Sequence, residues 1–198
     1  KDKPVVHTVR IGVLEPLTGS AAAIGRREML GVRYANSLVN SLTINKEAYE
    51  IELLPVDCGS TVDSARQAAE ALAQQDVSVV IGVSDSTLSL AVGEIFEANG
   101  IAVIGAGCSD DAITREGNYY FRLCATDGQE NAVLADFALE RFGGGVAYVV
   151  SVDDEEGRTL AERFRLAFEA RGGSVFYDTV RPGTTDFAPY LERAKSAG

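Results

Sequence analysis

Short apolar runs alternate along this chain with longer stretches of helical periodicity, and this alternation constrains the fold more than any other feature. The apolar runs are rich in β-branched residues, as buried strands are. They occupy residues 9–14, 49–56, 77–83, 101–107, 118–124, 145–152 and 174–180. Helical patterns lie between them, at residues 21–39, 62–74, 130–142, 156–170 and 186–197, with a further helix ending near residue 98. The sequence therefore predicts an α/β fold in which parallel strands are joined by right-handed helical crossovers.

The third apolar run, VSVVIGV at residues 77–83, is continuous and largely β-branched. Such a run is typical of a central parallel strand that helices cover on both faces. Three residues that follow it, Ser84, Ser86 and Thr87, can each cap a helix through a side-chain hydroxyl. We expect that helix to run to about Ala98 and to stop at the Asn-Gly turn behind it.

Turn-forming residues interrupt the pattern at CATDG, residues 124–128, and the alternation restarts after them. At 198 residues the chain is long enough for one domain or two small ones. We therefore predict an N-terminal α/β unit at residues 1–124 and a second α/β unit at residues 125–198.

The charge balance argues against a nucleic-acid partner. Asp and Glu total 29 and Lys and Arg total 18, a net charge of −11, and an acidic chain repels phosphate backbones. Hydrophobic residues make up 46% of the chain, which is enough to bury a core. The longest apolar runs fall far short of the ~20 residues that a membrane helix needs. The chain opens with KDKPVVH and shows no apolar leader, so it is either cytoplasmic or a mature chain whose leader was removed.

The sequence lacks the common catalytic motifs, with no GxSxG, P-loop, CxxC or HExxH pattern. The GAGCSD segment at residues 105–110 resembles a phosphate-binding loop but lacks the third glycine and follows the fourth strand rather than the first. Cys108 could be a nucleophile, but the one histidine, His7, lies far away in sequence, and a small buried thiol is the better interpretation. The acidic run DDEE at residues 153–156 could bind a cation, although such runs are usually solvated loops. We predict neither an enzyme nor a metal or cofactor site.

The cysteines leave their pairing open. Cys108 and Cys124 each follow a strand of the same predicted sheet, so they could form a disulfide bond if those strand ends adjoin. Cys58 follows the second strand and is expected to be a free thiol.

Small polar residues follow two of the predicted strands, where a parallel sheet binds its ligands. Ser84, Ser86 and Thr87 follow the third strand, and Ser109 follows the fourth. The first group also opens a helix, where unpaired N–H groups and the helix dipole favour an anion. Together these residues could hold a carboxylate, although a serine in such a place is commonly no more than a helix cap.

The segment IGVLEPLTGSAAAIGRREMLGVRYA at residues 11–35 resembles the opening of the periplasmic branched-chain amino-acid-binding proteins, the type I solute-binding proteins of ABC importers. Further similar segments follow in the family's order and cover nearly the whole chain: VSVVIGVSDSTLSLAV, GIAVIGAGCSD, NYYFRLCATDGQE, DDEEGRTLAERF, ARGGSV and PGTTDFAPYL. The resemblance implies a fold of two α/β lobes joined by three crossovers, with the ligand held between them. Residues 1–124 would form most of the first lobe and residues 125–198 the first part of the second, whose C-terminal remainder is absent.

The resemblance also implies roles for individual residues. Ser86 matches the serine that binds the α-carboxylate of the ligand. Ser109 matches a hydroxyl residue that meets both the carboxylate and the α-ammonium, Gly107 would offer its carbonyl to the ammonium, and Cys108 lies between them in the same loop.

Two further positions depart from the family pattern. Ile24 stands where members often carry a bulky aromatic, and Glu156 stands where most carry a tyrosine that covers the ligand from the second lobe. Glu156 could select a ligand with a second positive charge, or it could be a solvent-facing loop residue.

On this resemblance, the chain is expected to be a non-catalytic, extracytoplasmic protein. It would capture an amino acid or a related small carboxylate and deliver it to the membrane permease of an ABC importer, in the periplasm or outside the cell. A ligand-binding domain of a sensor, a receptor or an amide-responsive regulator is the alternative, and a Rossmann-like enzyme is a third hypothesis.

Overall fold

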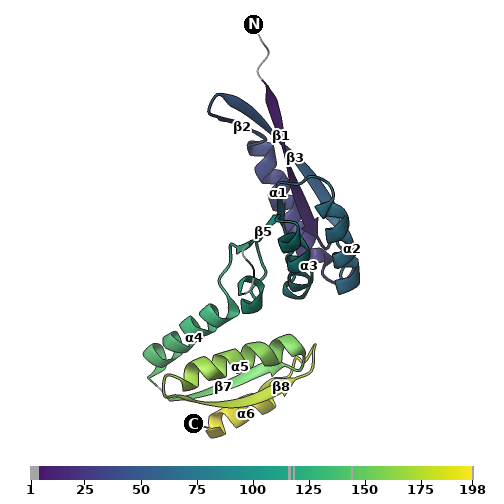
Figure 1. Cartoon of the computed structure of the whole chain (residues 1–198). Coiled ribbons are helices and arrows are strands. Elements are labelled where there is room, and N and C mark those ends of the chain that lie inside the picture. Colours follow the sequence, from purple (N-terminus) through teal and green to yellow (C-terminus); the bar gives the residue numbers. More distant parts are fainter. Residues whose placement is uncertain (1–4, 116, 118, 144, 198) are drawn as a thin grey trace. The chain divides into compact units, whose positions relative to one another are not determined.

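The computed structural model describes residues 5–115, 117, 119–143 and 145–197. The chain divides into two compact units, Lys1–Cys124 and Ala125–Gly198, and Figure 1 shows the course of the chain through both. Each unit is an α/β arrangement with its own sheet, as the alternation of apolar runs and helical patterns predicts.

The first unit contains a six-stranded sheet in the order β2-β3-β1-β4-β5-β6. The strands are β1 (Val6–Glu15), β2 (Ser41–Ile44), β3 (Glu47–Asp57), β4 (Val79–Ile81), β5 (Ala102–Gly105) and β6 (Tyr120–Arg122). All neighbouring pairs are parallel except β2 and β3, which are antiparallel. The carboxyl ends of the parallel strands therefore lie at one edge of the sheet, where the sequence predicts the ligand.

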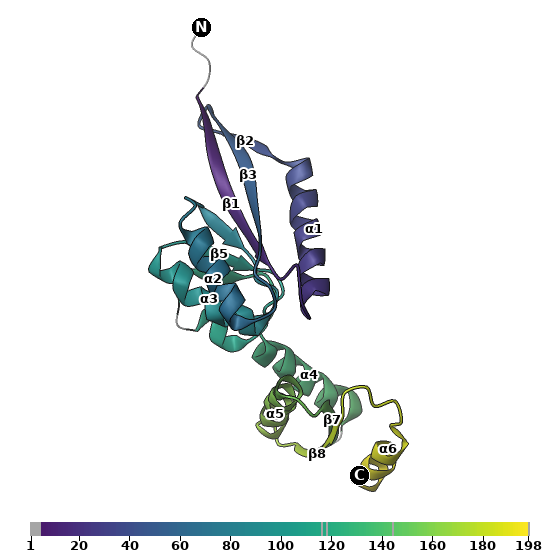
Figure 2. The same cartoon turned by 90° about the vertical axis from the view of Figure 1, so that its right-hand side faces the viewer.

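Helices lie on both sides of this sheet. In Figure 2, α1 (Ala22–Leu38) lies on one side, and α2 (Val62–Ala73) and α3 (Ser86–Ala98) lie together on the other. The core sits under α2 and α3, where Leu72, Val80 and Phe96 are fully buried. Val80 is the middle residue of β4, so the prediction of a central parallel strand in VSVVIGV is confirmed, although the paired part is only Val79–Ile81. Cover on both faces is not confirmed, because Val79 and Ile81 are only half-buried.

Side-chain caps fix the starts of two of these helices. Thr61 and Ser64 form a reciprocal capping box at the start of α2. At α3 the cap is Asp85, whose Oδ1 accepts a hydrogen bond from the Leu88 N–H at 2.9 Å. The prediction of a hydroxyl cap there was wrong. A carboxylate at the N-cap position satisfies the same N–H group and also interacts favourably with the positive end of the helix dipole.

The second unit contains a two-stranded parallel sheet of β7 (Val146–Val152) and β8 (Ser174–Val180). Its helices are α4 (Asp127–Phe142), α5 (Glu155–Glu169) and α6 (Ala188–Ala197). The small core of this unit is built by Ala135, Phe164 and Phe168, from α4 and α5. Within this unit Arg163 forms an ion pair with Asp127 at 3.1 Å and joins α5 to the start of α4.

The strand β2 and the short 3₁₀ helix η1 (Asp111–Thr114) were not expected from the sequence. Both residues of the turn between β2 and β3, Asn45 and Lys46, have positive φ angles of 52° and 72°. This is the backbone of a two-residue hairpin turn, which usually carries a glycine. Because neither residue of this turn is glycine, the sequence does not indicate the hairpin.

Candidate functional site

Two loops meet at the carboxyl ends of β4 and β5. Ser86 is the first residue of α3, and its Oγ accepts a hydrogen bond from the Asp110 N–H at 3.3 Å. The residue before Asp110 is Ser109, which is half-buried. The structure thus joins the loop that carries Ser86 to the loop that carries Ser109, at the edge of the sheet where the sequence predicts a carboxylate site.

Gly107 lies on the same loop and is exposed. A Cβ atom at this position would lie 2.8 Å from Glu28 Oε1, a carboxylate oxygen of α1. The glycine therefore lets the β5–η1 loop and α1 approach each other closely.

Cys108 was placed among the ligand-binding residues because it lies between Gly107 and Ser109, but the structure places its side chain in the core, as the interpretation of a small buried thiol predicts. It is fully buried, and its Sγ lies 3.7 Å from the Tyr120 hydroxyl. Its neighbours Gly107 and Ser109 are exposed and half-buried, so the loop turns only this thiol inward. A ligand at the strand ends could meet the backbone of Cys108 but not its side chain.

The other two predicted residues lie on helices. Ile24 is in the first turn of α1 and its side chain is 48% exposed. Glu156 is an exposed residue in the first turn of α5, in the second unit. Ile24 and Glu28 are four residues apart and therefore share one face of α1.

Sequence analysis missed a buried carboxyl group at the end of β1. Glu15 is fully buried, and its Oε2 accepts hydrogen bonds from Ser84 N–H at 3.1 Å and from Ser84 Oγ at 2.8 Å. The pKa of Glu15 is raised to about 8, mainly by burial; the Ser84 bonds act to lower it and the nearby Glu28 carboxyl acts to raise it. The sequence signal that could have indicated this buried carboxyl group is the position of Glu15 directly after a buried apolar run.

The turn after β1 is held by a second carboxylate. Asp57, at the end of β3, accepts hydrogen bonds from Leu17 N–H at 2.8 Å, Thr18 Oγ1 at 2.7 Å and Gly59 N–H at 2.8 Å. Burial alone would raise the pKa of Asp57, but these bonds lower it overall. The Pro-Leu-Thr-Gly turn is thereby fixed in front of α1.

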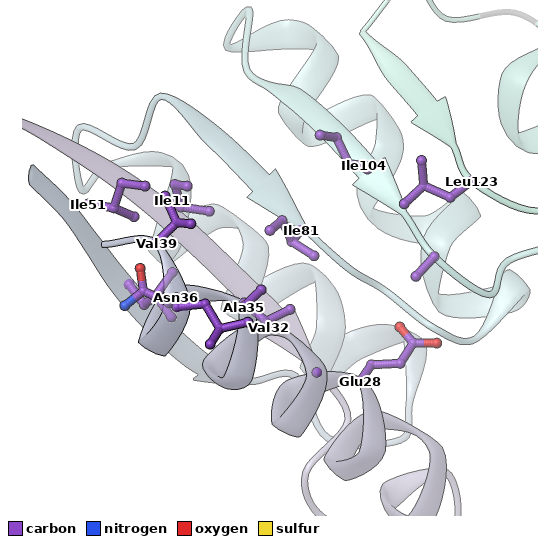
Figure 3. Close-up of a pocket in the computed structure, with 14 residues that line it drawn as sticks. Ile11, Glu28, Val32, Ala35, Asn36, Val39, Ile51, Ile81, Ile104 and Leu123 are labelled. Carbon is purple, nitrogen blue, oxygen red and sulfur yellow. The ribbon is translucent and has the colours of Figure 1, made fainter. Parts of the chain in front are cut away.

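A large groove runs between α1 and the sheet, with a cavity volume of about 830 Å³. Figure 3 shows that its side chains are mostly aliphatic, with Glu28 near one end and Asn36 farther along α1. Ser86, Gly107 and Ser109 do not line it. The groove and the predicted strand-end site are therefore different places, and Glu28 belongs to the groove while also touching the loop of the site.

The three cysteines, all in the described part of the chain, form no disulfide bond. Cys124 Sγ instead donates a hydrogen bond to the carbonyl oxygen of Cys108 at 3.3 Å. The possible bridge between these two residues is therefore not formed in this structure. The pKa of the Cys58 thiol is raised to about 12, mainly by burial and in part by the nearby Glu15 and Asp57 carboxyls.

We expect a thiol reagent to titrate three thiols per chain in denaturant without reductant, because none of the three is bridged. In the native protein Cys124 should react first, since it is only half-buried while Cys58 and Cys108 are fully buried. A count of one thiol in denaturant would show that a bridge exists.

Among the residues that the structure describes, no group of three or more His, Cys, Asp or Glu side chains could hold a metal ion. Over the same residues, no helix is both long and apolar enough to span a bilayer.

The family described as "Periplasmic binding protein" matches residues 8–198. The chain belongs to this family. It is 28% identical over 193 residues to the Leu/Ile/Val-binding protein homolog 3 of Brucella melitensis, a match that covers 96% of this chain and 52% of that protein. The fold prediction of a type I periplasmic binding protein is therefore confirmed, and the chain spans about half the length of the relatives it matches.

Two solved structures show the same likeness. The leucine binding protein LivK of Thermotoga maritima is 29% identical, with a TM-score of 0.74, and the match covers 95% of this chain and 53% of that one. A solute binding protein of an ABC transporter from R. palustris, solved with 4-hydroxybenzoate, is 25% identical with a TM-score of 0.74, and the match covers 96% of this chain and 52% of that one.

Proposed function

We propose that this chain is the ligand-binding part of an extracytoplasmic solute-binding protein, which captures an amino acid or related small carboxylate for the permease of an ABC importer. The observation that carries the proposal is the meeting of the Ser86 and Ser109 loops at the carboxyl ends of parallel strands. The similarity to a protein named for leucine and to a protein solved with 4-hydroxybenzoate supports the same class of ligand, because both molecules carry a carboxylate.

The groups around Ser86 suit a carboxylate. Its Oγ already accepts the Asp110 N–H, so its own hydroxyl hydrogen can be donated to a ligand. The N–H groups of Ser86 and Thr87 open α3 and make no hydrogen bond within the described residues. N–H groups at a helix start, together with a hydroxyl, can bind a carboxylate without a fixed positive charge.

A thermal-shift screen of L-amino acids and small aromatic acids on this protein tests the proposal. A ligand that binds only the folded state raises the apparent unfolding temperature in proportion to its affinity and concentration. We expect at least one amino acid or small carboxylate to do so. A screen in which no such molecule changes the unfolding temperature would contradict the proposal.

Replacing Ser86 with alanine is expected to weaken the binding of the ligand so identified by about tenfold or more, because a hydrogen bond to a charged group contributes roughly 1.5–3 kcal/mol. Isothermal titration calorimetry measures the change. Ser41→Ala, at an exposed position on β2, is the matched control and should leave the affinity unchanged. Equal affinities of Ser86→Ala and the unmodified protein would remove Ser86 from the site.

A further inference from the structure

Two carboxyl groups meet beside the proposed site. Glu15 comes from the end of β1 and Glu28 from α1, and their carboxyl groups are close enough to share a hydrogen bond once one of them is protonated. Glu15 is fully buried. With both groups ionised, Glu15 Oε1 and Glu28 Oε2 are each buried without a hydrogen-bond donor. Two touching carboxylates in such a place cannot both keep their charge.

One proton resolves this conflict. A proton on Oε1 of Glu15 can be donated in a hydrogen bond to the Glu28 carboxylate. Oε2 of Glu15 continues to accept both hydrogen bonds from Ser84. Burial raises the pKa of both carboxyls, and the hydrogen bond from Glu15 lowers that of Glu28. At neutral pH the pair therefore holds one proton and one negative charge. Glu15 is fully buried and Glu28 only half-buried, so ionisation costs more at Glu15 and the proton stays there.

That charge has no cation to balance it. Among the described residues, no Lys, Arg or His forms an ion pair with Glu15 or Glu28. Glu15 also interacts with the Cys58 thiol, which stays neutral, and the groups that face this thiol from the neighbouring loops are the carboxyls of Asp57 and Asp85. A half-buried carboxylate without a cation is costly, so the arrangement favours a positive group supplied from outside.

The free side of this carboxylate faces the loop of the proposed site. Glu28 Oε1 lies against Gly107, at 2.8 Å from where a Cβ would be, and Figure 3 shows the carboxyl group at an end of the groove, turned away from its aliphatic side chains. The Gly107 loop is also the loop that the Ser86 side chain contacts through Asp110. A carboxylate bound at Ser86 and a cation bound at Glu28 would therefore both lie along the Gly107–Asp110 loop.

We propose that Glu28, positioned by Glu15, binds the ammonium group of the ligand beside Gly107 and thereby selects amino acids over acids that lack an amino group. This inference rests on the proposed function and deepens it. It distinguishes between leucine, for which one similar protein is named, and 4-hydroxybenzoate, with which another was solved, since only leucine carries an ammonium group.

The test compares L-leucine with 4-methylpentanoate, which has the same carbon skeleton and carboxylate but no ammonium, and with 4-hydroxybenzoate. Calorimetry on the unmodified protein should give an affinity for L-leucine at least about tenfold above that for either acid, the range expected for hydrogen bonds to a charged group. In Glu28→Gln this preference should be lost, with weaker L-leucine binding and unchanged or tighter 4-methylpentanoate binding.

Two variants separate selectivity from simple structural damage. Glu15→Gln should keep the preference for L-leucine, because the glutamine amide can donate to Glu28 as the proton does. Glu70→Gln, an exposed change on α2 that also removes one negative charge, should leave both affinities unchanged. If Glu28→Gln does not fold, Gly107→Ala replaces it, since the added methyl group would displace the Glu28 carboxylate and should also reduce the preference.

The outcomes distinguish this inference from the proposed function. A Glu28→Gln variant that keeps the preference for L-leucine would overturn the role of Glu28, and so would equal affinities for L-leucine and 4-methylpentanoate in the unmodified protein. Binding of 4-hydroxybenzoate but not of L-leucine would also overturn the role of Glu28. The proposed function, capture of a small carboxylate, would still hold in that case. Binding of no amino acid and no small carboxylate would overturn the proposed function itself and this inference with it.

Discussion

Glu15→Gln is expected to stabilise the protein at neutral pH, and the gain should increase as the pH rises from 5 to 8. The pKa of Glu15 is raised from an ordinary value of 4.5 to about 8 by burial. Between these values the unfolded chain loses this proton and the folded chain keeps it, so the free energy of unfolding falls as the pH rises. At pH 7 the cost is about 3 kcal/mol, at about 1.4 kcal/mol for each pKa unit.

Glutamine removes this cost because it does not ionise in either state. Its amide oxygen can accept the two bonds from Ser84, and its amide nitrogen can donate to Glu28. Urea unfolding of both proteins at pH 5, 6, 7 and 8 gives the difference in the free energy of unfolding, and Glu70→Gln serves as an exposed control with no such trend. A difference that stays constant across this pH range would show that Glu15 is ionised in the folded protein.

Gly25→Ala is expected to destabilise the protein by about 1–3 kcal/mol or more, the usual cost of overpacking. Gly25 lies in the first turn of α1, and a Cβ atom there would lie 2.3 Å from the carbonyl oxygen of Pro16. That oxygen belongs to the backbone of the turn held by Asp57, so it cannot move aside as a flexible side chain could. α1 must shift instead, and Glu28 shifts with it.

Gly31→Ala is the matched control because it lies on the same helix with nothing within 4 Å of the added atom. Alanine has the higher helix propensity, so this variant should be neutral or more stable by up to about 1 kcal/mol. Thermal unfolding of the two variants measures the contrast. Equal unfolding temperatures would mean that α1 is not packed closely against the turn at Pro16.

The strands could be predicted because each is a short apolar run between turn formers, but their ends could not. β4 and β5 are shorter than the runs 77–83 and 101–107. The last residues of each run, such as Gly82 and Gly107, leave the ladder to form the loops of the candidate site. Hydrophobicity does not distinguish a residue that pairs in a sheet from one that packs in the loop just beyond it.

The meeting of the Ser86 and Ser109 loops could be expected, since both follow neighbouring strands of one parallel sheet. The contact between Glu15 and Glu28 could not. It depends on how closely α1 packs against the strand ends, and this distance is set by Gly25 against Pro16 and by Gly107 against Glu28. The inward turn of the Cys108 side chain likewise depends on tertiary packing, against Tyr120.

The most direct test of the central claim, that the strand-end loops of the first unit bind the carboxylate of a small solute, is a titration of the ¹⁵N-labelled chain followed by NMR. L-leucine and 4-hydroxybenzoate are the probes, and the amide signals of residues 86–88 and 107–110 are the readout. We predict that at least one probe shifts these signals together, with a single dissociation constant, and leaves those of the exposed strand β2 unchanged. Saturating shifts confined to other residues, or none at millimolar concentrations of both probes, would contradict the account.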